Sequence, residues 1–147
     1  MSLIIDRAEI GGMRSFRKDQ RGVISVEFAL VVPLLITLVF AAVEFGGILY
    51  TQAAAESATN NVARQLATNR ITQAQAKKAV TPLLPVWARV NVDVAVTASN
   101  ATKPESNLYT VATTIPMAQA APTGFLKFIY VDRNISATVT QQQEPTS

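Results

Sequence analysis

The sequence predicts an α+β protein in which one long N-terminal helix is followed by a small antiparallel sheet. Two observations carry this expectation. An apolar run occupies residues 23–43, and alanine-rich, helix-forming sequence follows it to about residue 70. Beyond residue 86 the period changes to two, because valines occupy alternate positions from Val90 to Val96. Short antiparallel strands need a cover on one face, and the long helix is available to provide it.

The composition excludes several kinds of functional site. The chain has 147 residues, the size of one domain, and contains neither cysteine nor histidine. Disulfides, thiolate metal sites and a cysteine nucleophile are therefore excluded, and the commonest general base is missing. The net charge of +3 is small, so nucleic acid is not an expected partner. We expect a protein that is not an enzyme and that uses no cofactor or metal.

Residues 1–22 are a polar, basic leader in front of the apolar run. Basic residues stand close to that run at Arg14, Arg17, Lys18 and Arg21. Positive residues beside a membrane-spanning segment tend to stay in the cytoplasm. The leader is therefore expected in the cytoplasm, and the chain beyond the apolar run is expected on the outer side of the membrane.

Residues 23–43 are expected to form a single transmembrane helix. The segment is 21 residues long, enough to cross the hydrocarbon core, and its one charged residue is Glu27. From Phe28 to Val43 no polar face recurs at a helical period, so a buried helix of a water-soluble protein fits poorly. Pro33 removes one backbone hydrogen bond and predicts a bend. A cleaved secretory signal peptide stays open as an alternative, although no A-x-A site follows the run directly.

Residues 44–81 are expected to continue the helix and to add a short second helix. One apolar face recurs at helical spacing, at Ala55, Ala58, Val62 and Leu66. Gly46 and Gly47 interrupt this extension, and each lowers helix stability by about 1 kcal/mol. The glycine pair either lets another helix approach closely or acts as a flexible joint, and the sequence leaves both open.

The second helix is expected over residues 72–80, with Thr72 as its N-cap and with Pro82 and Pro85 ending it. Residues 82–147 are expected to form the β-rich domain. Three segments have the alternation of half-buried strands: 90–97, 108–115 and 134–140. The segment Phe125–Val131 is apolar except for Lys127, and its sequence does not distinguish a strand from a buried loop.

The head of the apolar run resembles the processing site of type IV pilin precursors. Gly22 is followed, after four residues, by Glu27 and Phe28 at the start of a charge-poor helix. The fuller pattern is similar to the TadE-like family of tight-adherence (Flp-type) pilus proteins, which are minor pilins or pseudopilins. It lies in Arg21–Gly22, Val26–Leu35, Glu44–Gly46, Ala58 and Ala63–Arg64. The resemblance covers about residues 21–66.

The resemblance implies a pilin-like fold and a processed precursor. A membrane-embedded prepilin peptidase would cleave after Gly22, so that Val23 becomes the new N-terminus. Glu27 and Phe28 would then act in assembly with other pilins, minor pilins and inner-membrane assembly proteins. The protein would cross the bacterial cytoplasmic membrane once, and it would either enter the surface pilus or only prime its assembly. The major subunits of these pili are very small, so a chain with a distal β-rich domain is expected to be a minor component.

Glu27 acquires a physical role from its place in the apolar segment. An unpaired carboxylate in lipid costs a few kcal/mol or more. An ion pair with the α-amine of Val23 of a neighbouring copy would lower that cost. This amine exists only after cleavage, so processing would act as a switch for assembly. The alternative is a carboxylate that reaches the headgroups without a partner.

Two other classes of function stay open. One is a membrane-anchored extracytoplasmic binding module that keeps residues 23–43 as an unprocessed signal anchor. The other is an anchored enzyme, and its acid–base candidates would be Asp93, Lys103, Glu105, Lys127 and Asp132. These distal charges form no known motif, so solvated surface charges are expected at these positions.

Overall fold

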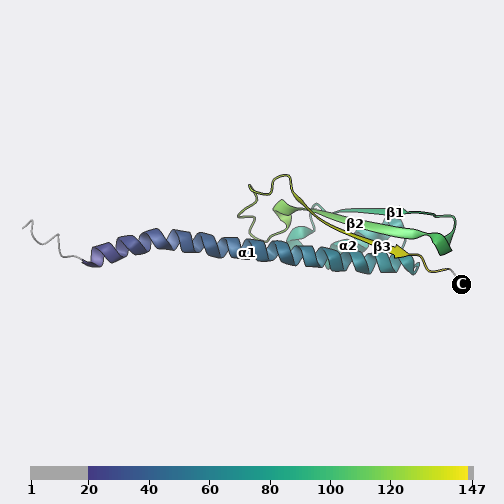
Figure 1. The fold of residues 1–147 in the computed structure, drawn as a ribbon, viewed down its shortest axis with the longest axis horizontal. Coiled ribbons are helices and arrows are strands. Elements are labelled where there is room, and N and C mark those ends of the chain that lie inside the picture. Colours follow the sequence, from purple (N-terminus) through teal and green to yellow (C-terminus); the bar gives the residue numbers. More distant parts are fainter. Residues whose placement is uncertain (1–19, 146–147) are drawn as a thin grey trace, which may run out of the picture. The chain divides into compact units, whose positions relative to one another are not determined.

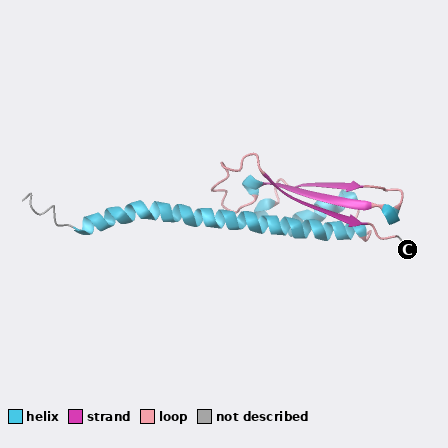
Figure 2. Ribbon diagram, viewed as in Figure 1, coloured by secondary structure: helices cyan, strands magenta, loops and turns pink. Residues whose placement is uncertain are grey.

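The computed structural model describes residues 20–145, so most of the expected leader (residues 1–22) lies outside the described residues. The main elements in chain order are α1 (Gln20–Ala67), α2 (Ala76–Val80), β1 (Asp93–Ala98), β2 (Leu108–Pro116) and β3 (Asn134–Gln142). Figure 2 shows the helices and strands in separate colours. A long N-terminal helix packed on a three-stranded antiparallel sheet confirms the predicted α+β class.

The helix α1 is continuous over 48 residues and runs through Pro33, Gly46 and Gly47. Because Pro33 has no N–H, the carbonyl one turn before it lacks its usual donor. The hydroxyl of Thr37 donates to the Pro33 carbonyl at 2.8 Å, a local bond that often accompanies bending. Figure 1 shows a gentle bend in the N-terminal part of α1, the part that contains Pro33.

The described part of the chain divides into two compact units, residues 20–39 and residues 40–145. In the part of the chain that is described, one helix is long and apolar enough to cross a membrane, and none of its most apolar stretch is buried. The second unit holds the C-terminal part of α1, the short helix α2 and the sheet.

The predicted apolar face of α1 is confirmed in the second unit. All four residues of this face, Ala55, Ala58, Val62 and Leu66, are buried with at most 2% exposure. The helix ends at Ala67, and Asn69 then adopts a left-handed conformation with φ of 56°. Asparagine tolerates this conformation after a helix, as glycine does.

The sheet has the strand order β1-β2-β3, with both pairs antiparallel. On the central strand β2, the side chains of Val111, Thr113 and Ile115 are buried at every second position. This alternation lets one face of the sheet cover the apolar face of α1. Figure 1 shows the sheet lying along the C-terminal part of α1.

The strand and helix boundaries differ slightly from the sequence-based expectation. The first strand begins at Asp93, because residues 90 and 91 form a turn in which Val90 is exposed. The second helix starts as a tight turn over Gln73–Gln75 before α2, and the Thr72 amide donates to the Gln75 side chain at 3.0 Å. Pro82 lies in the turn that follows α2.

Neither alternative for Phe125–Val131 describes the structure. The segment is a series of turns, held by bonds such as Ile129 N–H to the Leu126 carbonyl at 2.9 Å. Gly124, with φ of 59°, begins these turns. Phe128 and Val131 point largely into solvent, so an apolar sequence here forms an exposed loop.

Polar side chains tie α1 to the rest of the second unit. The hydroxyl of Thr59 donates to the hydroxyl of Thr113 on β2 at 2.7 Å, and both residues are fully buried. The hydroxyl of Thr51 donates to the Ala120 carbonyl at 2.6 Å and accepts from the Trp87 indole at 3.1 Å. Buried hydroxyls require such partners, and these contacts set the position of α1 against the sheet.

Candidate functional site

Gly22 and Val23 lie in the first turn of α1, which begins at Gln20. The peptide bond after Gly22 is therefore helical rather than extended, in contrast to the conformation that a peptidase requires. The first N–H groups of a helix have no partner within the helix, so unwinding this turn breaks few hydrogen bonds. Gly22 is exposed, and a Cβ atom built on it would meet nothing within 4 Å. The chain around Gly22 is open to an approaching enzyme.

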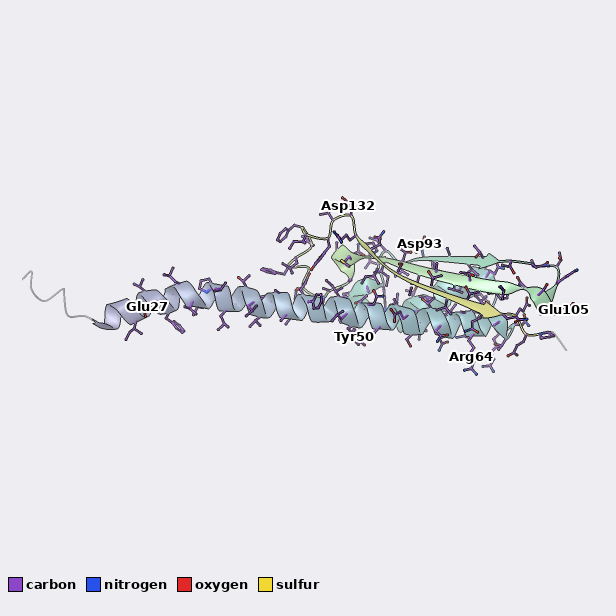
Figure 3. All side chains as sticks on the ribbon, in the orientation of Figure 1. Glu27, Tyr50, Arg64, Asp93, Glu105 and Asp132 are labelled. Carbon is purple, nitrogen blue, oxygen red and sulfur yellow. The ribbon has the colours of Figure 1, made fainter. Side chains whose placement is uncertain are left out.

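Glu27 lies on α1 one helical turn after Val23 and has an exposed side chain (Figure 3). Its neighbours on the helix are large apolar side chains that are also exposed: Ile24, Val26, Phe28, Leu30, Val31 and Leu34. Phe28 alone is 69% exposed. A single carboxylate surrounded by unburied apolar groups suits a helix that packs against lipid or against other helices.

The two adjacent glycines of α1 have opposite surroundings. A Cβ atom on Gly46 would meet nothing within 4 Å, whereas one on Gly47 would lie 2.5 Å from Cδ of Pro122 and 3.3 Å from Cα of Ala121. Gly47 therefore permits a close approach, and the segment that approaches is a loop of the same chain. In this structure the helix continues through both residues, so they form no break in α1.

The structure reveals a buried carboxylate, Glu44, to which the sequence analysis assigned no role of its own. Its side chain is 2% exposed. The Thr123 hydroxyl donates to one carboxylate oxygen, and the Leu126 amide donates to the other at 3.3 Å. Close by, the rings of Phe40 and Phe125 stack with centroids 5.5 Å apart. These contacts hold the loop before β3 against α1.

Helical periodicity could have identified Glu44 as a residue on the buried face of α1. Stepping back from Ala55 along the apolar face by three or four residues reaches Thr51, then Gly47 and Ile48, and then Glu44. All of these positions are buried. Periodicity does not identify the hydrogen-bond donor to Glu44, because Thr123 lies 79 residues later in the chain.

The five charged residues considered for an enzyme are all exposed, namely Asp93, Lys103, Glu105, Lys127 and Asp132. Asp93 begins β1, whereas Glu105 lies in the connection between β1 and β2, at the opposite end of the sheet (Figure 3). Asp93 and Glu105 are therefore far apart and do not form one site. Among the described residues, no group of three or more acidic side chains is placed to hold a metal ion.

An apolar exposed helix whose continuation packs on a three-stranded antiparallel sheet is a pilin-like arrangement. Residues 22–64 match the TadE-like protein family, so the chain carries a TadE-like domain over this range. The matched range lies entirely within α1 and begins at Gly22. The match describes this range of α1 and does not extend to the short helix α2 or to the sheet. No curated protein and no solved structure matched the chain.

Proposed function

We propose that this protein is a TadE-like minor pilin, or pseudopilin, that a prepilin peptidase cleaves after Gly22 and that acts in assembly of a tight-adherence (Flp-type) pilus. The observation that carries this proposal is the match to the TadE-like family within α1. The matched range begins at Gly22 and includes Glu27. The exposed apolar surface around Glu27 supports it, because a helix with that surface requires lipid or other helices around it.

Cleavage after Gly22 would create the partner for Glu27. The new α-amine of Val23 would lie one turn before the carboxylate on the same helix face. In an assembly of parallel helices, the amine of one subunit and Glu27 of its neighbour form an ion pair in a medium of low dielectric constant. Such a pair is far stronger there than in water, and it sets the register between neighbouring helices.

The proposed arrangement in the cell follows from the same helix. Residues 1–22 form the cytoplasmic leader, residues 23–43 cross the cytoplasmic membrane, and residues 44–81 and 82–147 form the extracytoplasmic part. The partners are the lipid bilayer, the prepilin peptidase, other pilins and the inner-membrane assembly proteins. On α1, small and polar side chains away from the sheet are exposed and available for such contacts: Ala53, Ser57, Asn61 and Arg64.

The mass of the intact protein tests this proposal. Protein isolated from its native host is expected to lack residues 1–22 and to begin at Val23. A Gly22→Leu variant is expected to keep its leader, because a bulky side chain crowds the backbone at the scissile bond. The matched control, Gly12→Leu, changes a leader glycine away from this bond and is expected to be processed normally. A wild-type protein that retains its leader would refute processing and would favour an unprocessed signal anchor.

A further inference from the structure

The loop between residues 122 and 133 exposes an unusual group of large apolar side chains. Phe125 is 42% exposed, Phe128 69%, Ile129 55% and Val131 70%. Single exposed apolar residues are normal on a protein surface, whereas a contiguous group marks a surface that contacts a partner or a membrane. We define this segment as the 122–133 loop. Figure 3 shows its side chains projecting around the labelled Asp132.

This exposure belongs to a loop that is well anchored at its base. Glu44 accepts hydrogen bonds from Thr123 and from the Leu126 amide, and Gly47 makes room for Pro122. Tyr130 packs against the hydrophobic core. Backbone bonds close successive turns along the loop, including Tyr130 N–H to the Lys127 carbonyl at 3.2 Å. The exposed apolar groups are therefore presented by a structured segment.

The contact between Phe125 and Phe40 fixes the level of the loop along α1. Phe40 lies three residues before Val43, the last residue of the expected span, and so about 4–5 Å inside its end. The Phe125 ring stacks on Phe40, which places the loop beside the end of the apolar run. Val43 and Phe45 on the helix are also about half exposed. Through the contact between Phe40 and Phe125, exposed apolar side chains of the loop adjoin the apolar part of the helix.

The chemistry of the loop matches the interface between hydrocarbon and lipid headgroups. Aromatic rings concentrate at that level in membrane proteins, and lysine reaches the headgroups along its apolar stem. Lys127 and Arg133 outnumber Asp132, so the loop carries net positive charge for anionic phosphates. We propose that the 122–133 loop inserts Phe128 and Ile129 into the outer interface of the membrane that α1 crosses. This inference rests on the proposed membrane anchoring of α1.

Spin labels on the full chain test the insertion. The chain contains no cysteine, so single Phe128→Cys, Leu108→Cys and Leu34→Cys variants can each carry one nitroxide. Leu108 is a matched control, because it is an exposed apolar residue at the other end of β2 from the loop. Leu34, 73% exposed and within the expected span, reports whether α1 is in lipid. The proteins are reconstituted in vesicles of phosphatidylethanolamine and phosphatidylglycerol, and collisions with oxygen and with a water-soluble nickel chelate are measured.

The expected result is an oxygen-to-nickel collision ratio that is severalfold higher at residue 128 than at residue 108 and highest at residue 34. A high ratio at 34 with equal, low ratios at 128 and 108 would overturn the loop insertion and leave the anchored helix intact. A high ratio at 108 equal to that at 128 would also overturn it, because lipid contact would not be specific to the loop. A low ratio at 34 would refute the anchoring itself, and with it the inference.

Discussion

At the scale of single residues, two adjacent glycines of α1 perform different tasks. Gly47 gives Pro122 and Ala121 a close approach to the helix, whereas Gly46 faces open space. Glycine is unfavourable in a helix interior, so a glycine is expected to persist where a side chain would collide. This reason applies to Gly47, and the structure provides no such reason at Gly46.

Substitution of these glycines by alanine is expected to change stability in opposite directions. Gly46→Ala should stabilise the protein by up to about 1 kcal/mol, because alanine is the better helix former. Gly47→Ala should destabilise it by about 1–3 kcal/mol, because the new methyl group displaces the proline ring and the backbone behind it. Thermal unfolding of the detergent-solubilised full chain measures both. Stabilisation by both substitutions would show that the loop moves away from residue 47 without a loss of stability.

Glu27 belongs to the same scale, because its single charge is proposed to set how its helix segment packs. Glu27→Ala is expected to leave the unfolding of the distal domain unchanged and to abolish co-purification with pilus components. The reason is that the ion pair with a neighbouring Val23 amine is lost while no contact of the sheet is touched. Glu56→Ala, which removes another exposed carboxylate of α1, is the matched control and should associate normally. Undiminished association of the Glu27 variant at equal abundance would contradict the pairing.

At the scale of elements, the loop before β3 depends on a buried carboxylate of α1. Glu44 is the acceptor for both the Thr123 hydroxyl and the Leu126 amide. A typical intramolecular hydrogen bond contributes about 0.5–1.5 kcal/mol to stability, and Glu44 accepts two. The attachment of this loop to α1 is therefore expected to weaken when the acceptor is removed, while the strand ladder stays intact.

Glu44→Ala is expected to accelerate hydrogen exchange of the Leu126 amide by roughly tenfold or more. Glu44→Gln is the matched control, because its side-chain oxygen still accepts from Leu126, and its effect should be smaller. Amides in the middle of β2, such as that of Val111, are expected to exchange at the wild-type rate in both variants. Equal exchange of the Leu126 amide in wild type and Glu44→Ala would show that this hydrogen bond does not hold the loop.

At the scale of the whole molecule, one helix belongs to both compact units. Residues 24–39 of α1 expose apolar side chains, whereas the part from Glu44 onward buries one face under the chain that follows. The change occurs where the charge-free run ends. A helix with such a division suits a subunit with one segment in lipid and a folded domain in water.

The charges before the expected span predict the orientation of the proposed membrane anchor. A reporter fused after Ser147 is expected to be active only if it functions outside the cytoplasm, because a basic leader is expected to stay inside. Replacing Arg14, Arg17 and Lys18 by glutamine is expected to reduce that activity. A fusion to a reporter that works only in the cytoplasm provides the control. Activity of this second reporter at the same position would contradict the proposed topology.

The sequence by itself determined the class of elements, because helix and strand each have a local period. The apolar face at Ala55, Ala58 and Val62 and the alternating strands were predictable from side-chain spacing alone. The resemblance to the TadE-like family likewise rests on one continuous stretch, and residues 22–64 match that family. A carboxylate in an apolar run is equally visible in the sequence, although its partner is not.

Only the tertiary structure decided what the later chain does to α1. The burial of Glu44 and the close approach at Gly47 depend on a loop about 80 residues later in the chain, and only the structure shows that Phe128 of this loop is exposed. Local periodicity indicates which face of a helix or strand a residue occupies. It does not identify the distant residue that donates a hydrogen bond to that residue. The apolar segment before β3 was therefore ambiguous in the sequence, because a short apolar run does not by itself distinguish a strand from a buried loop.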